Sequence, residues 1–238
     1  MPIVCLDMFT ATAAPVTIPG LAYPNVAVEG VSIQRFAMYN NIVYAEYIWV
    51  DRPDLFTEFI PAAPISKVDV YAIGQGRTGS AGGTATAGAG GSAGVQAVTK
   101  NYSLLASDYI CYFTESSTIF YNPGGNNVVV AMSGAFTGTY YLYGDTKYPV
   151  GTAAAAQAGG TYIPGKGSNG CTFLPDIRAA STVYPSSSSA VSLSAGALGI
   201  GAGGTGGART NLQTAAMSGL TGAGLGGCAM IMLRIPIG

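Results

Sequence analysis

Glycine is concentrated in two tracts of this chain, and these tracts limit its possible folds more than any other feature. Residues 74–94 are almost wholly Gly, Ala, Ser and Thr, and residues 196–207 form a second glycine-rich stretch, in a chain with 35 glycines among 238 residues. Glycine loses more backbone freedom on folding than any other residue, so such tracts do not form stable helices. Two uses remain open: close packing of extended polyproline-II-like segments, or a flexible surface loop.

Short runs of β-branched and aromatic residues predict strands in most of the chain. The longest run is Ile42–Val50, and the turn residues 51–54 end it. The other expected strands are residues 26–28, 31–33, 56–60, 68–73, 95–98, 109–113, 118–121, 127–132, 139–143 and 228–235. No segment has a long helical period, and only residues 209–218 are expected to form one or two helical turns. The sequence therefore predicts an all-β protein with little helix.

Composition changes near residue 66. Residues 1–66 have ordinary composition interrupted by prolines, and the glycine-rich part follows Lys67. The first glycine tract also lies between two expected strands, which favours packing or a surface loop over a linker between domains. We therefore expect a small β region at residues 1–66 and a glycine-rich, β-sandwich-like domain at residues 67–238.

Charged side chains are scarce. They make up 9 % of the residues, against about 25 % in an average soluble domain. We expect much of the surface to be buried against copies or partners, and the alternative is a monomer whose surface is hydrated by Ser, Thr and Asn. The net charge is −1 and the cations are scattered singly, which argues against nucleic-acid binding. No apolar run reaches the roughly 20 residues that a membrane helix needs, so no membrane insertion is expected.

Four cysteines, Cys5, Cys111, Cys171 and Cys228, are widely spaced and form no CxxC motif. The first residues lack the basic start and apolar stretch of a secretory signal, so synthesis in a cytoplasm is expected. In that compartment the cysteines are expected to be reduced and buried rather than paired.

Two short motifs suggest enzyme chemistry, and their surroundings argue against both. Residues 74–79 match GxGxxG, but no helix-forming sequence follows and no acidic residue lies between Asp69 and Asp108, so no nucleotide cofactor is expected. Residues 90–94 match GxSxG, but the chain has no histidine to activate the serine. The same absence removes the commonest metal ligand. The sequence predicts a protein with no catalytic residues, no cofactor and no metal site.

Tyrosine is abundant, and four of these residues cluster within nine positions: Tyr140, Tyr141, Tyr143 and Tyr148. Tyrosine offers rigid amphipathic contact area that suits recognition surfaces, and it also fills β-strands well. Both interpretations stay open. If a receptor is bound, the candidate residues are these four tyrosines and Arg77, the cation within the first glycine tract.

The chain from Lys67 onward resembles the glycine-rich domain of tailed-bacteriophage tail fibres and adhesins. An apolar strand, residues 68–73, runs straight into a glycine-rich tract, and strands with turn signals follow through residues 127–134. The chain then passes residues 201–207 and the pair Gly226-Gly227 to a terminal apolar strand. The glycine tracts here are diluted by Ala, Ser and Thr, and residues 143–191 are an insertion relative to that pattern.

The resemblance implies a β-sandwich-like domain, usually homotrimeric, at the virion surface and often in contact with the host cell. We therefore expect a non-enzymatic virion structural protein of the tail-fibre, adhesin or tail-tip kind, made in the host cytoplasm. Residues 1–66 would attach it to other virion proteins or trimerise it. The alternative is a capsid decoration or head-fibre protein. Less favoured are a carbohydrate-cleaving spike, because no acidic pair has suitable surroundings, and a non-viral surface protein.

Overall fold

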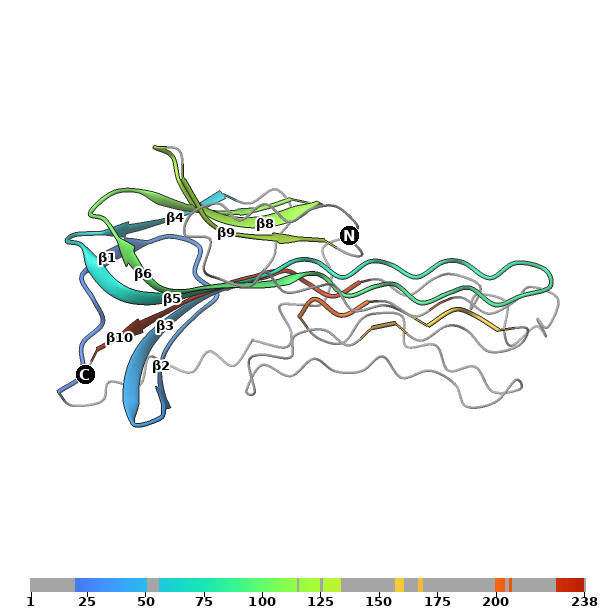
Figure 1. Ribbon diagram of the computed structural model, residues 1–238, viewed down its shortest axis with the longest axis horizontal. Helices are drawn as coiled ribbons and strands as arrows, with labels where there is room; N and C mark the ends of the chain where they lie inside the picture. Colours follow the sequence, from blue (N-terminus) through green and yellow to red (C-terminus); the bar gives the residue numbers. More distant parts are fainter. Residues whose placement is uncertain are drawn as a thin grey trace.

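The computed structural model describes residues 20–50, 56–114, 116–124, 126–133, 157–160, 167–168, 200–203, 206 and 226–237. Within these residues the fold is all-β, as predicted, with ten strands in two antiparallel sheets and no helix (Figure 1). Sheet A contains, in spatial order, β1 (Val26–Val28), β4 (Phe56–Pro61), β7 (Tyr109–Phe113), β8 (Ser117–Asn122) and β9 (Asn126–Met132). Sheet B contains β2 (Ile33–Tyr39), β3 (Ile42–Val50), β10 (Met230–Pro236), β5 (Ile65–Ile73) and β6 (Gln96–Leu104).

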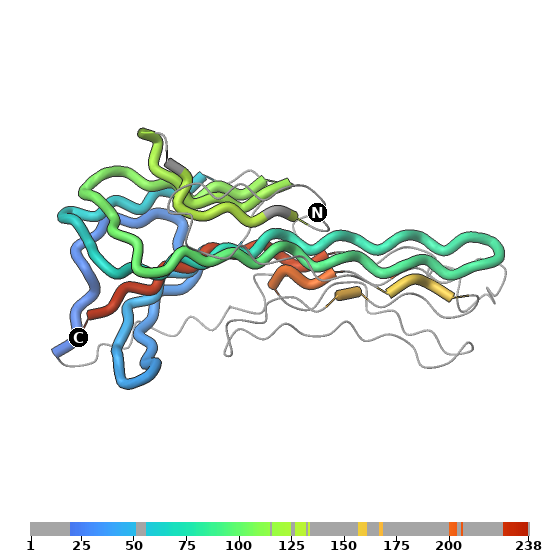
Figure 2. Tube along the Cα trace, in the orientation of Figure 1, coloured from blue at the N-terminus to red at the C-terminus, as the bar shows by residue number. Residues whose placement is uncertain are grey.

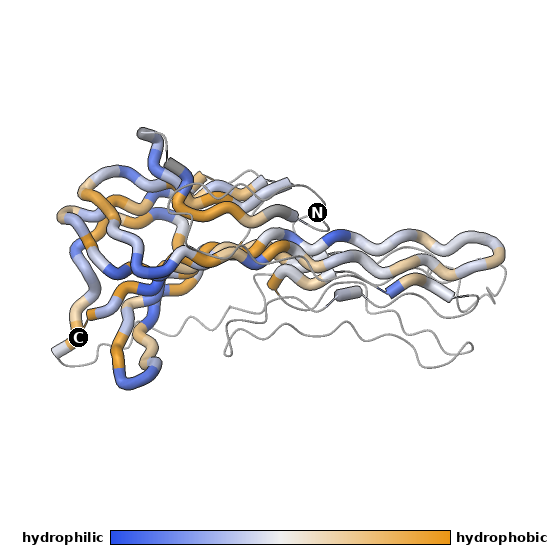
Figure 3. The backbone as a smooth tube through the Cα atoms, viewed as in Figure 1, coloured by the Kyte–Doolittle hydropathy of each residue, from blue (hydrophilic) through white to orange (hydrophobic). Residues whose placement is uncertain are grey.

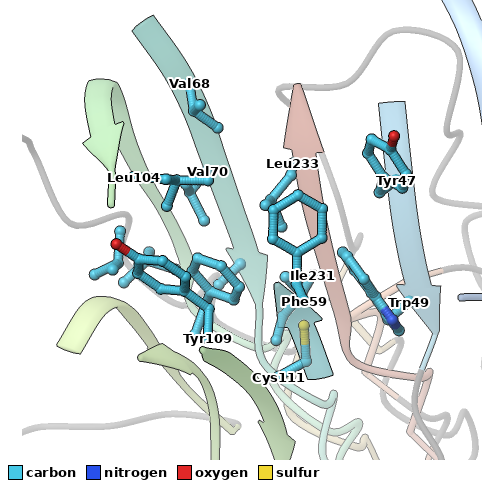
Figure 4. Close-up of a cluster of buried hydrophobic side chains, with 14 of the residues drawn as sticks. Tyr47, Trp49, Phe59, Val68, Val70, Leu104, Tyr109, Cys111, Ile231 and Leu233 are labelled. Atoms are coloured by element: carbon cyan, nitrogen blue, oxygen red, sulfur yellow. The ribbon is translucent and has the colours of Figure 1, made fainter. Parts of the chain in front are cut away.

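The two sheets pack face to face around one apolar core. Successive side chains of a strand point to opposite faces, so alternate residues of each strand enter this core. Trp49, Phe59, Tyr109 and Phe120 are fully buried there, and Figure 4 shows several of these side chains converging from both sheets. The rings of Trp49 and Phe59 meet edge to face, with centroids 6.0 Å apart. Such a sandwich is the arrangement expected from the sequence.

Strand β10 occupies the centre of sheet B, between β3 and β5, and both of its faces are buried. Its residues Met230 to Pro236 pair with β3 from Val50 to Tyr44, and Met230 to Arg234 pair with β5 from Ile73 to Asp69. The terminal apolar strand therefore completes a sheet whose other strands lie far earlier in the sequence.

Most predicted strands lie within a few residues of the observed ones, and the clearest omission is β2. The sequence suggested a strand only at residues 31–33, whereas β2 extends from Ile33 to Tyr39 along the edge of sheet B. It is joined to β3 by Asn40 and Asn41, whose φ angles of 49° and 64° are those of a tight two-residue hairpin turn. The expected strand at residues 139–143 and the expected helical turns at residues 209–218 lie outside the described residues.

Strands from both sides of residue 66 share each sheet. Sheet A combines β1 and β4 with β7, β8 and β9, and sheet B combines β2 and β3 with β5, β6 and β10. The described strands on either side of this expected boundary therefore form one sandwich with a common core.

A set of extended glycine-rich segments projects from one end of the sandwich (Figure 1). The connection between β5 and β6, residues 74–95, forms a long hairpin, and Figure 2 shows its regular undulation and the shorter segments that run alongside it. We call these segments the glycine bundle, comprising residues 74–95, 157–160, 167–168, 200–203, 206 and 226–229. Figure 3 shows that apolar residues concentrate in the sandwich, whereas most of the projecting hairpin is of intermediate hydropathy.

Candidate functional site: the glycine bundle

The long hairpin of the glycine bundle is held together by backbone hydrogen bonds that recur every third residue. The N–H groups of Arg77, Ser80 and Gly83 donate to the carbonyl oxygens of Ser92, Ala89 and Thr86, at 2.9 Å in each case. A three-residue repeat is that of the polyproline-II helix, which has no internal hydrogen bonds. Its backbone groups are therefore available to neighbouring segments.

The returning half of the hairpin, residues 87–95, lies inside the glycine bundle. The N–H groups of Ala87, Gly90 and Gly94 donate to the carbonyls of Gly160, Gln157 and Gly201. The carbonyl oxygen of Gly91 accepts a hydrogen bond from Ser168 N–H. Segments that are distant in sequence thus surround residues 87–95, most of which are buried.

Glycine is required at several positions because the backbones approach too closely for any side chain. A Cβ atom added to Gly88, Gly91 or Gly94 would lie 1.8–1.9 Å from a carbonyl oxygen of the outgoing half. None of these three residues has a positive φ angle, so the requirement is for space and not for an unusual backbone conformation. The sequence left two uses of glycine open, close packing of extended segments and a flexible loop. These three glycines serve close packing.

The same close approach connects the other segments of the glycine bundle. A Cβ atom on Gly203, Gly206 or Gly226 would lie 1.7–1.9 Å from the carbonyl oxygens of Gly91, Gly88 and Gly76, respectively. These contacts lie between backbones, which have little freedom to move aside. The glycine bundle is therefore an ordered element. Its segments lie this close together because no side chains stand between them.

The outgoing half of the hairpin presents the exposed side chains of the projecting element. Arg77, Thr78, Ser80, Thr84 and Thr86 are exposed. The predicted receptor-binding residue Arg77 is thus on the surface, and its backbone N–H is hydrogen-bonded to Ser92. The other predicted receptor-binding residues, Tyr140, Tyr141, Tyr143 and Tyr148, lie outside the described residues.

The two enzyme-like motifs are parts of the glycine bundle. In the GxGxxG segment, the N–H groups of Gly74, Gly76 and Arg77 donate to backbone carbonyls of the chain, and no helix begins there. These donors are therefore already used and form no phosphate cradle. In the GxSxG segment, Ser92 is buried on an extended, non-strand segment of the hairpin, and it does not lie on a turn before a helix.

A second apolar cluster anchors the base of the glycine bundle to the outer face of sheet B. Ile73 at the end of β5, Ile200 and Met230 are buried together there, and Cys228 packs beside them. Gly201 N–H donates to the Cys228 carbonyl oxygen at 2.7 Å. The start of β10 is thus tied both to the sheet and to the glycine bundle.

The expectation that the cysteines are reduced is wrong for Cys228, which is disulfide-bonded, whereas Cys111 is a free, buried thiol. Spacing alone did not reveal this pairing, because the contact depends on how distant segments fold back. Burial raises the pKa of the Cys111 thiol, so it stays protonated and unreactive in the folded protein.

The two described cysteines should differ in alkylation. We expect iodoacetamide at pH 8 to modify neither in the native protein, because one is disulfide-bonded and the other is buried and protonated. Denaturation without reductant should expose Cys111 alone, and denaturation with reductant should expose both. Peptide mass spectrometry measures this pattern, and alkylation of Cys228 in the denatured, unreduced protein would contradict the disulfide.

A buried ion-pair cluster on sheet B was not recognised in the sequence. Glu46, which is fully buried, accepts hydrogen bonds at 2.7 Å from Nε of both Arg35 and Arg234. The Arg234 guanidinium lies 3.8 Å from the ring centroid of Tyr39 and donates to the Tyr71 hydroxyl at 3.4 Å. Burial lowers the pKa of Arg234 and the Glu46 carboxylate raises it, and the balance is a raised pKa. The Glu46–Arg234 ion pair joins β3 to β10.

No group of three or more His, Cys, Asp or Glu side chains that could bind a metal occurs among the described residues. The part of the chain that the structure describes also has no helix long and apolar enough to cross a membrane. A scan against protein-family models and a search of curated proteins both found no match for this chain.

Proposed function

We propose that this chain is a non-enzymatic structural protein of a phage virion surface, of the tail-fibre, adhesin or tail-tip type, that contributes to host attachment. The observation that carries the proposal is the glycine bundle. The glycine bundle is an ordered element whose backbones pack together without side chains between them. It projects from the well-packed sandwich, so the exposed side chains of its hairpin are held away from the sandwich. Such an arrangement suits a spacer that presents a contact surface to a host cell.

In this proposal the sandwich provides the stable base. It contacts other virion proteins, and copies of the chain associate as a homotrimer. The exposed outgoing half of the hairpin, with Arg77 and the threonines near its turn, contacts a molecule of the host surface. The chain is made in the host cytoplasm and acts at the virion surface. The Cys228 disulfide supports a place of action outside the cell, because disulfides persist in oxidising surroundings.

Substitution of exposed residues of the outgoing half tests this role. Deleting residues 74–94 would also remove the buried half of the hairpin, so point changes are cleaner. We expect particles carrying Arg77→Glu together with Thr84→Lys to adsorb to host cells at least about tenfold more slowly, the change produced by about 1.4 kcal/mol. The rate is measured from the loss of free particles over time.

The control is Leu105→Ser, which changes an exposed residue of the sandwich, and its particles should adsorb like wild type. Equal incorporation of each variant, shown by labelling the protein on particles with a specific antibody, separates attachment from assembly.

The same labelling locates the protein on the particle. Labelling on the tail supports the proposal and labelling on the head contradicts it. Normal adsorption of the double variant would show that the outgoing half is not the contact surface.

A further inference from the structure

The base of the glycine bundle is the place where three of its segments meet next to β10. Gly201 N–H donates to the Cys228 carbonyl oxygen, and Gly227 N–H donates to the Ala202 carbonyl oxygen, both at 2.7 Å. Gly76 N–H donates to the Gly227 carbonyl oxygen at 3.0 Å. We call these five residues the bundle base. Through them, the chain that enters β10 is bonded both to the long hairpin and to the segment that contains Ala202.

Few side chains stabilise the bundle base. All of its residues except Cys228 are glycine or alanine, and glycine loses the most backbone freedom when it becomes ordered. Its backbone hydrogen bonds replace hydrogen bonds to water, so each contributes little net stability. Larger side chains do not fit, because a Cβ atom at Gly76 would lie 1.8 Å from the Ala202 carbonyl oxygen. Additional stability must therefore come from a link that needs no room between the backbones.

Cys228 supplies such a link. It is disulfide-bonded and 8 % exposed, and its side chain is the only one in the bundle base larger than a methyl group. It packs with Ile73, Ile200 and Met230 on the outer face of sheet B. A disulfide stabilises the ordered state mainly by restricting the unfolded chain, and this requires no added volume between paired backbones.

The sandwich does not depend on this bond. Strand β10 pairs with β3 on one side and with β5 on the other, and its residues Ile231 and Leu233 are fully buried in the core. The cysteine of the sandwich core, Cys111, is a free thiol. Reduction of the Cys228 disulfide should therefore loosen the bundle base and leave the sandwich folded.

We infer that the Cys228 disulfide is a redox latch of the glycine bundle. Thiols are kept reduced in a cytoplasm and disulfides persist outside it, so the bundle base is loose after synthesis and closes after release. In the closing step Cys228 and its partner cysteine together give up two protons and two electrons, which reduce one small-molecule disulfide to two thiols. The inference rests on the proposed synthesis in a host cytoplasm and action outside it, and it adds the step that makes the attachment element rigid.

Amide hydrogen exchange on the purified full-length chain tests the latch. One sample is oxidised with glutathione disulfide, the other is refolded in dithiothreitol, and alkylation with mass spectrometry verifies the state of Cys228. In the reduced sample the amides of Gly76, Gly201 and Gly227 should exchange at least about tenfold faster, a low value for the loss of a typical disulfide. The amides of β3 and β7 should exchange equally in both samples, and reoxidation should restore the protection of the bundle base.

Two variants separate the latch from other effects of the reductant. Cys228→Ser should exchange like reduced wild type with or without dithiothreitol, whereas Cys111→Ala keeps the disulfide and should respond to dithiothreitol as wild type does. Equal exchange of the bundle base in oxidised and reduced wild type would overturn the latch. Faster exchange of β3 and β7 by the same factor would also overturn it, because the bond would then stabilise the whole fold.

The exchange measurement involves no host cell, so its outcome is separate from that of the proposed attachment role. Equal exchange in the two samples would remove the latch and leave the role in attachment. Normal adsorption of particles with Arg77→Glu and Thr84→Lys would remove the proposed contact surface, and a bundle base that loosens on reduction would still support the latch.

Discussion

Gly91→Ala should prevent the glycine bundle from closing while the sandwich remains folded. The added Cβ atom would lie 1.8 Å from the Arg77 carbonyl oxygen, far inside van der Waals contact. The opposing atoms belong to backbones, and Gly203 approaches from another segment, so no side chain can rotate away. Overpacking of a well-packed interior costs about 1–3 kcal/mol, and we expect about 3 kcal/mol or more here.

Amide hydrogen exchange measures this effect residue by residue. In Gly91→Ala the amides of Arg77, Ser80, Gly90 and Gly94, which are hydrogen-bonded within the glycine bundle, should lose protection. The amides of β3 and β7 should keep their protection, because the sandwich core does not include Gly91.

Gly83→Ala is the matched control for this change. A Cβ atom at Gly83 meets its nearest neighbour, the Thr86 carbonyl oxygen, only at 3.8 Å, and the residue has no positive φ angle. We expect the free energy of unfolding of Gly83→Ala to differ from wild type by less than about 1 kcal/mol. The change can be a gain in stability, because alanine reduces the conformational freedom of the unfolded chain. Equal exchange protection in both variants would mean that glycine is not required for packing at Gly91.

Local sequence pattern predicted individual strands well because each strand is encoded by its own residues. Ile42–Val50 and Tyr109–Phe113 were predicted with the observed bounds, since both are dense in β-branched or aromatic residues. Strand β2 was missed beyond Ile33, because Gln34 and Arg35 interrupt its apolar pattern at a sheet edge. Edge strands bury less of their surface, so they need fewer apolar residues.

The pairing between distant segments could not be predicted from local sequence pattern. The sequence shows Gly88, Gly91 and Gly94 at a three-residue spacing, which is a visible sign of polyproline-II packing. It does not show that Gly203, Gly206 and Gly226 approach those backbones, because that contact depends on the path of the whole chain. For the same reason, neither the pairing of Cys228 nor the position of β10 between β3 and β5 could be predicted from the sequence.

The charged cluster of Arg35, Glu46 and Arg234 contains residues that are unusual in the sequence, although the sequence does not indicate that they form ion pairs with one another. Glu46 stands out as a carboxylate within an apolar strand, and Arg234 as a cation within the terminal strand. Only the register, which sets Glu46 opposite both Arg35 and Arg234, reveals that they form one ionic group. The cluster thus joins β2, β3 and β10.

Glu46→Gln should destabilise the sandwich by about 3–5 kcal/mol, the range for removing one partner of a buried ion pair. Glutamine keeps the size of the side chain, but Arg234, only 9 % exposed, would lose its carboxylate. The free energy of unfolding in urea measures the loss, and Glu58→Gln, a change at an exposed glutamate of sheet A, should stay within about 0.5 kcal/mol of wild type.

The double variant Glu46→Gln with Arg234→Met separates loss of the charge pair from loss of packing. Methionine removes the buried cation and retains an apolar chain that can lie against Tyr39, which now contacts the guanidinium. We therefore expect the double variant to be more stable than Glu46→Gln alone, since an unpaired buried charge costs more than an apolar replacement. If the two changes were simply additive, the Glu46–Arg234 pair would contribute no coupling energy, and the junction of β3 with β10 would depend on backbone pairing and apolar packing alone.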